Sequence, residues 1–275
     1  WSLRAGVLMW SYIGKVGSGA EMSEIEERIQ YLNCGDSAIA VQFGEAADIA
    51  VNLRVRALDL ALKENPIRGI TEVIPTYRSE MIHYDPLVIR CSVLVKAIRE
   101  MLQEVDWNAI QPSNEVVTVP IWYRCEKTEL QAIADYEKIT ADEVIRIHTS
   151  KLHYTFQMGV APGTVYLSSP TGSFTIPRKA TPVPKPYAST IQVWSTHTTF
   201  SSFFTQSGWN FLGRAPAPSY NPNRPEDPFL IKPGQWVQFR EIDRDEFEQI
   251  EHDFLENRYE RELSRWDFSA LPFKT

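Results

Sequence analysis

The sequence is poor in cysteine, and its three cysteines lie far apart: Cys34, Cys91 and Cys125. An odd, scattered set of this kind does not build a disulfide framework. None of the three forms a C-x-x-C pair, so a thiolate zinc site has no support and no metal is expected. We therefore expect reduced, mostly buried thiols and a cytoplasmic location.

Positive charge is also in short supply. The chain has 275 residues, with 28 Lys and Arg against 35 Asp and Glu, a net charge of −7. An acidic chain repels phosphate backbones, so nucleic acid is not an expected partner. Long hydrophobic runs are missing too. Residues 1–16 are mostly apolar, but they are too short to span a membrane and are interrupted by Arg4 and Lys15, so no membrane partner is expected either.

Familiar catalytic signatures are absent from the sequence as well. There is no H-x-x-x-H pair, no paired-carboxylate motif and no G-x-S-x-G turn. These patterns would place two metal ligands on one helix face or expose a serine nucleophile on a sharp turn. Metallohydrolase and serine-hydrolase functions consequently have no support.

The first 21 residues differ in character from the rest of the chain. Gly17, Ser18, Gly19 and Ala20 have the chemistry of a flexible linker, and Met22 resembles a natural start. Residues 1–21 are therefore interpreted either as a fused peptide or as a native extension that packs on the body of the protein.

Residues 22–106 are predicted to form a small N-terminal domain. Turn and strand patterns predict a hairpin over 29–43, and apolar residues at helical spacing predict a helix over 49–62. Two short strands over 71–82 and a second amphipathic helix within 86–105 come next. The order β-β-α-β-β-α favours one sheet covered by one layer of helices.

A polar linker separates this domain from residues 115–242, which are rich in short strands. A capping box at Thr140 and Glu143 indicates a helix start near the beginning of this region. Frequent Pro and Gly punctuation after Tyr154 favours a barrel or sandwich. In residues 243–275, apolar residues recur at helical spacing and predict a helical tail: Phe247, Ile250, Phe254, Leu255 and Tyr259.

Several specific strings occur in a fixed order: G-D-S-A from Gly35, P-T-Y-R-S from Pro75, H-Y-D-P from His83, A-P-G-T-V-Y-L from Ala161, P-R-K-A-T-P from Pro177, S-G-W-N-F-L-G-R-A-P from Ser207 and K-P-G-Q-W-V-Q-F from Lys232. They resemble, in the same order, motifs of the family that holds the B subunit of 5-oxoprolinase and allophanate hydrolase subunit 1. The carboxyltransferase subdomain of that family also occurs in a sporulation kinase A inhibitor. The tail resembles, less specifically, the segment that comes after this domain in urea carboxylases.

The resemblance implies a fold, a partner and a class of substrate. The implied fold is α+β: a small two-layer domain followed by a cyclophilin-like β-barrel. Family members work with a homologous partner subunit or domain on small amide, lactam or urea-like groups. ATP is therefore expected only together with a partner subunit, and no tightly bound cofactor is expected in this chain.

The chain departs from the family at one place. A glycine-rich family stretch is replaced here by residues 185–202, which contain no glycine, and Trp194, His197 and Phe200 would fill the space. Thr164 likewise stands where the family has Phe. Three functions remain open: an enzyme subunit acting on an amide, lactam or urea-like group; a repurposed barrel enzyme for a bulkier apolar substrate; and a non-catalytic kinase-inhibitor type of binding module.

The candidate site is predicted in the barrel, between residues 159–166 and 194–200. The candidate catalytic residues are His197, as an acid or base near neutral pH, Arg178 and Tyr166. The candidate ligand-binding residues are Lys179, Trp194, Phe200, Trp209, Arg214 and His148. Each has a structural alternative: an ion pair for the cations, the core for the aromatics, and a buried hydrogen bond for His148 and His197. His153 and His252 are expected at the surface.

Overall fold

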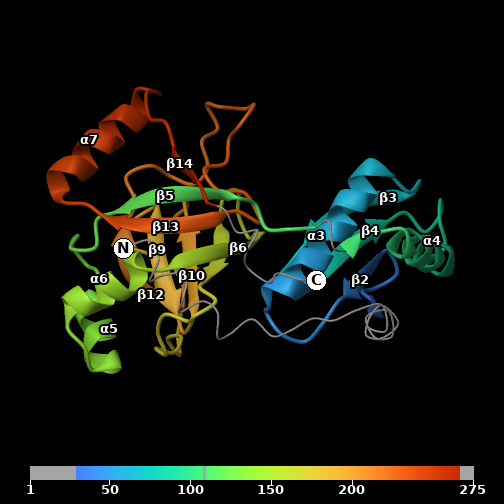
Figure 1. Ribbon diagram of the computed structural model, residues 1–275, viewed down its shortest axis with the longest axis horizontal. Helices are drawn as coiled ribbons and strands as arrows, with labels where there is room; N and C mark the ends of the chain where they lie inside the picture. The colour runs from blue at the N-terminus through green and yellow to red at the C-terminus, as the bar shows by residue number, and fades with distance from the viewer. Residues whose placement is uncertain (1–28, 108–109, 267–275) are drawn as a thin grey trace. The chain divides into compact units, whose positions relative to one another are not determined.

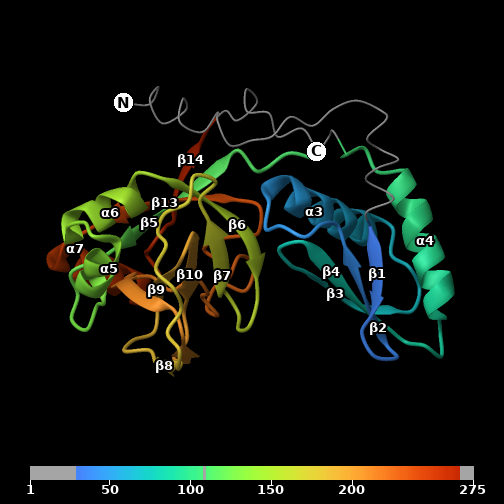
Figure 2. The same ribbon diagram turned by 90° about the horizontal axis from the view of Figure 1, so that it is seen from below.

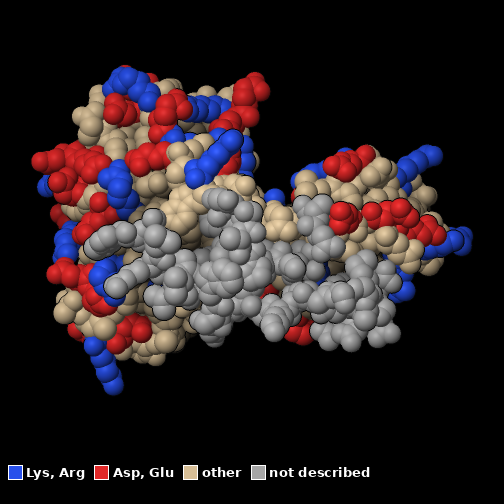
Figure 3. Space-filling model, viewed as in Figure 1, with Lys and Arg blue, Asp and Glu red and all other residues tan. Residues whose placement is uncertain are grey.

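The computed structural model describes residues 29–107 and 110–266, and within that span the chain divides into two compact units on either side of residue 112. Residues 1–21, interpreted above as a fused or native extension, lie outside the described residues. None of the described helices has the length and apolar character needed to cross a bilayer. On the face of each unit seen in Figure 3, acidic and basic side chains are interspersed.

The N-terminal unit is one antiparallel sheet with two helices packed against it (Figure 1). Its elements are β1 (Gln30–Asn33), β2 (Ala38–Gln42), α3 (Ile49–Glu64), β3 (Ile70–Pro75), β4 (Ser79–Tyr84) and α4 (Cys91–Gln103). The strand order is β1-β2-β4-β3, and alternate residues of β2 and β4 join both helices in one hydrophobic core. The predicted β-β-α-β-β-α order is confirmed.

Local chemistry explains where these elements begin and turn. Gly35 has a φ of +74°, which favours glycine, and the Cys34 amide donates to the Ala38 carbonyl across the first hairpin. Asp48 caps α3 by accepting a 2.7 Å hydrogen bond from the Ala50 amide.

The C-terminal unit is an eight-stranded sheet that curls around a second hydrophobic core (Figure 2). Its elements are β5 (Glu115–Ile121), α5 (Leu130–Glu137), α6 (Ala141–Thr149), β6 (Leu152–Met158), β7 (Val165–Ser168), β8 (Val183–Pro184), β9 (Thr190–Trp194), β10 (His197–Ser201), β11 (Gln206–Ser207), β12 (Asn210–Arg214), β13 (Trp236–Glu241), α7 (Arg244–Leu255) and β14 (Glu262–Arg265). The strand order is β12-β9-β10-β7-β6-β13-β5-β14, with β13 and β5 parallel.

The end strand β12 meets the segment that follows β5 at a seam. Just beyond β5, the Trp122 amide donates to the Arg214 carbonyl at 2.9 Å, and the Arg214 amide of β12 donates back at 3.2 Å. Thr140 caps α6 through a 3.1 Å bond from the Glu143 amide, as the capping box predicts. Helices α5 and α6 lie side by side against the core.

The tail is only partly helical, so the prediction of a helical tail over 243–275 needs correction. Helix α7 ends at Leu255, and β14 then pairs antiparallel with β5 from Glu262 to Arg265. Leu255, one of the apolar residues at helical spacing, is 72% exposed. The backbone groups along the edge of β5 need partners, and β14 supplies them. Residues 267–275 lie outside the described part.

The cysteines are free, and they are less buried than expected. Only Cys125 is buried, and burial raises the pKa of its thiol to about 11. Cys34 and Cys91 are half-buried at the surface of the N-terminal unit. Within the described residues, no three His, Cys, Asp or Glu side chains gather as a metal site would require.

Gly213 is expected to be the least replaceable glycine of the seam. An added Cβ would lie 2.7 Å from Ile121 Cγ2 and 3.1 Å from the Trp122 carbonyl oxygen. Gly213→Ala should therefore destabilise the C-terminal unit by about 1–3 kcal/mol, because the seam must open to admit the methyl group. Gly159→Ala is the matched control, since a Cβ there meets nothing within 4 Å. Equal unfolding midpoints for the two variants in urea would contradict this account.

Candidate functional site

Five of the predicted side chains meet on one face of the curled sheet. The Trp194 ring stacks at 29° on the His197 ring with 5.3 Å between centroids, and it meets the Trp209 ring edge-on at 5.6 Å. Tyr166 lies 5.9 Å from Trp209, and the Arg178 guanidinium lies 5.8 Å above the Trp194 ring. We call Tyr166, Arg178, Trp194, His197 and Trp209 the aromatic cluster.

Strand register brings these residues together. Trp194 of β9 and His197 of β10 are directly paired, and Tyr166 of β7 is paired with Thr199 of β10. Successive side chains of a strand point to opposite faces. Val193 and Phe200 therefore enter the hydrophobic core, whereas the cluster lies on the opposite face.

Burial sets the ionisation of the cluster. Loss of water lowers the pKa of His197, so its imidazole is neutral at neutral pH. Burial also raises the pKa of Tyr166, and the nearby charge of Arg178 acts against that rise. Arg178 is exposed and pairs with no carboxylate among the described residues. The cluster thus combines aromatic walls, a neutral imidazole, a phenol and one cation.

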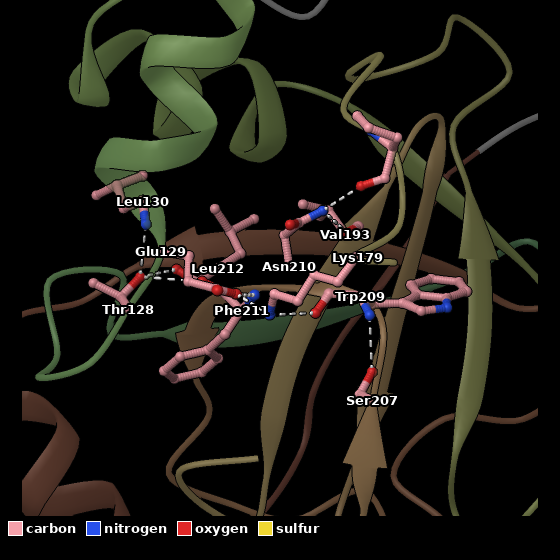
Figure 4. Close-up of polar contacts among 11 residues, drawn as sticks. Thr128, Glu129, Leu130, Lys179, Val193, Ser207, Trp209, Asn210, Phe211 and Leu212 are labelled. Atoms are coloured by element: carbon pink, nitrogen blue, oxygen red, sulfur yellow. Dashed lines mark hydrogen bonds and ion pairs between the residues drawn. The ribbon is translucent and has the colours of Figure 1, made fainter. Parts of the chain in front are cut away.

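The segment that carries Arg178 is fixed by its neighbour Lys179 (Figure 4). Lys179 Nζ donates to Glu129 Oε2 at 2.6 Å and to the Trp209 carbonyl at 3.1 Å. Glu129 Oε2 also accepts from the Phe211 amide at 2.6 Å, and Asn210 Nδ2 donates to the Pro177 carbonyl. The ion-pair alternative therefore holds for Lys179, which positions the Arg178 segment against β12.

The structure does not bring the remaining predicted residues into the cluster. Phe200 is fully buried in the core. Arg214 pairs with Glu251 at 2.8 Å and lies between the rings of Tyr187 and Phe247. It lines a separate pocket of about 200 Å³ beside α7.

His148 and His153 belong to the interior of the C-terminal unit. A 2.7 Å hydrogen bond joins His148 Nδ1 to the Tyr123 hydroxyl, and a 3.1 Å bond joins its Nε2 to the Thr198 hydroxyl. His148 thus has the buried, hydrogen-bonded environment of its structural alternative. The expectation that His153 lies at the surface is wrong, because its side chain is fully buried and its Nε2 donates to the His148 carbonyl. Alternation along β6 turns it inward.

The sequence of this chain matches the family model described as carboxyltransferase domain, subdomain C and D, over residues 29–231. The chain belongs to this family. It is 26% identical over 231 residues to the B subunit of 5-oxoprolinase from Bacillus subtilis (strain 168), covering 80% of this chain and 95% of that protein. It is 23% identical to the B subunit of 5-oxoprolinase from Escherichia coli O157:H7, covering 74% and 92% of the two chains.

Solved structures of larger proteins contain the same fold as this carboxyltransferase-domain protein. The crystal structure of TTHA0988 aligns with a TM-score of 0.66 and 28% identity, over 75% of this chain and 40% of that one. The K. lactis urea amidolyase aligns with a TM-score of 0.72 and 18% identity, over 86% and 16% of the two chains. This chain therefore spans less than half of each of these proteins. The likeness to the urea amidolyase, at 18% identity, shows the fold alone.

Two residues on the elements that carry the cluster, Glu129 and Gln192, were not singled out from the sequence. No sequence pattern indicated Glu129, because its partners Lys179 and Phe211 are distant along the chain. Gln192 lies on β9 between Ile191 and Val193, both of which enter the core. A period-two reading of that strand would have placed Gln192 on the same face as Trp194.

Proposed function

We propose that this chain resembles the B subunit of 5-oxoprolinase in its role and acts, with a homologous partner subunit, on a small amide, lactam or urea-like group. The observation that carries the proposal is the aromatic cluster, where an exposed guanidinium and a neutral imidazole converge on two tryptophan rings. The named relatives, each the B subunit of a 5-oxoprolinase, support the class of substrate and the need for a partner.

The chemistry of the cluster suits a small planar polar group. The faces of Trp194 and Trp209 contact a flat amide, lactam or urea group, and Arg178 binds a carbonyl or carboxylate oxygen of the ligand. A neutral His197 accepts a proton from the attacking group and then donates it to the leaving group. The Tyr166 hydroxyl donates a hydrogen bond to the same ligand. ATP, where the reaction uses it, is bound only with the partner subunit.

A second candidate is a repurposed barrel enzyme that takes a bulkier apolar substrate. The specific observation in its favour is the edge-on pair of Trp194 and Trp209, which offers more apolar surface than a small lactam would cover. Binding of 5-oxoproline and of larger apolar amides, compared by the fluorescence of these tryptophans, separates the two candidates. The first candidate function predicts that 5-oxoproline binds more tightly than the larger apolar amides.

The test of the proposed function uses the chain mixed with its homologous partner subunit. The chain alone is expected to turn over neither 5-oxoproline nor urea in the presence of ATP. In the mixture, His197→Ala should lower turnover by roughly 10²–10⁴-fold through loss of the acid–base group. Its melting temperature should stay close to that of the unchanged chain.

Arg178→Ala should chiefly raise KM, because the guanidinium binds the ligand. Arg146→Ala, on the exposed face of α6, is the matched control for a lost surface cation. Full activity of both His197→Ala and Arg178→Ala would move the site away from the aromatic cluster. A fall in the melting temperature of His197→Ala would instead show that the imidazole is structural.

A further inference from the structure

The N-terminal unit contains a groove of about 610 Å³ between the C-terminal ends of α3 and α4. Most of the side chains that line it are apolar. Leu60 of α3 is 45% exposed, and the other apolar side chains are buried or half-buried. An apolar hollow of this size indicates a binding surface. The apolar lining consists of Ala57, Leu60, Ala61, Met101, Val105 and Ile110.

The remaining side chains give the groove a negative charge. Glu64, Glu104 and Asp106 line it, and no Lys or Arg of the described residues does. Glu64 and Glu104 are exposed, and neither forms an ion pair with a described residue. The rim of the groove therefore carries carboxylates that no cation of the described chain neutralises.

The two helix ends add to this negative potential. Helix α3 ends at Glu64 and α4 ends at Gln103, so both C-terminal ends border the groove. A helix C-terminus carries roughly half a negative charge and favours a cation nearby. The last turn of α4 contains no basic residue, and Lys63 in the last turn of α3 pairs with Asp59 at 2.7 Å. Carboxylates and helix ends thus both attract a positively charged partner.

The walls of the groove favour a helical partner over an extended one. They are formed by the side chains of two helices, whose backbone groups are bonded within each helix. An extended peptide needs backbone partners, which a strand edge supplies and a helix surface does not. A helix satisfies its own backbone, and its ridge of apolar side chains packs between the two helices that border the groove.

We infer that this groove docks a cationic amphipathic helix of a partner protein. Apolar side chains spaced i, i+3, i+4 and i+7 on that helix contact Leu60 and Met101, and its Lys or Arg side chains pair with Glu64 and Glu104. The inference goes beyond the proposed function and does not depend on it, because the groove contains no residue of the aromatic cluster.

The experiment measures binding of synthetic helical peptides to the full chain by calorimetry. The probe is a peptide of about 18 residues, long enough to span a small domain, with leucine along one helical face and lysine on the others. The matched peptide has glutamate in place of every lysine. The lysine peptide should bind at least roughly tenfold more tightly, and its affinity should fall as the salt concentration rises. Equal binding of the two peptides would overturn the inference.

Variants of the chain locate the binding. Glu64→Lys combined with Glu104→Lys should weaken binding of the lysine peptide by roughly tenfold, because two attractions become repulsions. Glu72→Lys combined with Glu226→Lys is the matched control, since it changes the net charge equally at exposed sites outside the groove. Equal losses in the two double variants would show attraction by net charge alone, and the inference would be wrong.

Leu60→Gln tests the apolar contact separately from the charge. It should weaken binding by roughly fivefold, because less apolar surface is removed from water in the complex. Leu87→Gln, at a leucine that is 95% exposed and lies outside the groove, should leave the affinity unchanged. An unchanged affinity in Leu60→Gln would contradict docking in this groove.

Two other occupants are distinguished by the same methods, and either would overturn the inference. If the full chain binds no peptide but a chain that starts at Met22 does, the first 21 residues occupy the groove. If the chain without peptide associates with itself in sedimentation and Leu60→Gln prevents this, a second copy occupies it.

Discussion

Replacing Glu80 by leucine is expected to stabilise the N-terminal unit by about 1–3 kcal/mol at neutral pH. Glu80 lies on β4 and is fully buried, and neither carboxyl oxygen has a hydrogen-bond partner among the described residues. Burial, and then the negative charge of Asp59, raises the pKa of Glu80 from 4.5 to about 9, with Lys63 acting in the opposite direction. In the folded protein the Glu80 carboxyl group is thus neutral, and no hydrogen bond from the described residues stabilises it.

The same residue should make the stability of this unit fall as the pH rises. The unfolded chain releases the Glu80 proton above about pH 4.5, whereas the folded unit keeps it to about pH 9. The contribution is therefore fully present below pH 4.5. Between these values it is lost with a slope of up to ~1.4 kcal/mol per pH unit.

Glu80→Gln separates the two effects. Glutamine does not titrate, so the slope should vanish. Its buried amide also lacks partners, so at pH 5, where little of the titration cost is present, the gain seen with leucine should be absent. Hydrogen exchange of β4 and α3 peptides at pH 5, 7 and 9 reports the stability of this unit. Glu72→Leu, at an exposed position of β3, is the control. A leucine variant less stable than the unchanged chain at all three pH values would show that Glu80 has a stabilising partner.

The C-terminal unit is expected to respond to pH in the opposite sense. Burial lowers the pKa of His153 from 6.5 to about 4. Burial, followed by the charges of His153 and Lys151, lowers the pKa of His148 well below its ordinary value. Between pH 6.5 and 4 the unfolded chain binds protons that the folded unit excludes. Stability should therefore fall on acidification by up to ~1.4 kcal/mol per pH unit for each histidine.

His153→Phe should reduce this acid sensitivity, because the replacement removes a group that titrates. His153 Nδ1 is buried without a hydrogen-bond partner among the described residues, so its protonation in the folded unit is unfavourable. The flanking rings of His148 and Phe239 suit an aromatic replacement. Urea unfolding of the C-terminal unit between pH 4 and 7 measures the slope. His252→Ala, an exposed site on α7, should leave the slope unchanged. An equal slope in His153→Phe and the unchanged chain would assign the acid sensitivity to other groups.

Most of the element order could be predicted, because local chemistry determines it. The turn at Gly35, the cap at Thr140 and the helical spacing over α3 all act within a few residues. The prediction of a helical tail was wrong for the converse reason, because β14 forms only where the distant edge of β5 is available. Strand formation by a polar segment depends on a partner that periodicity cannot reveal.

The sequence predicted which residues belong to the candidate site better than it predicted how those residues are arranged. Trp194, His197 and Phe200 looked equivalent along the chain, yet Phe200 faces the core and the other two face the cluster. A shift of one residue in strand register would exchange these faces. The ion pair of Lys179 likewise depends on Glu129, fifty residues away.

The sequence by itself determined that this protein has two units, the order of strands and helices within the first, and, through strings that occur in family order, membership of the carboxyltransferase-domain family. Only the tertiary structure decided which side chains share a face, which cations are neutralised, and which polar groups are buried without partners, as Glu80 and Gln192 are among the described residues. The physical reason is range: caps, turns and periodicity act between neighbours in the chain, whereas register, burial and ion pairing are set by segments that meet only when the whole sheet closes.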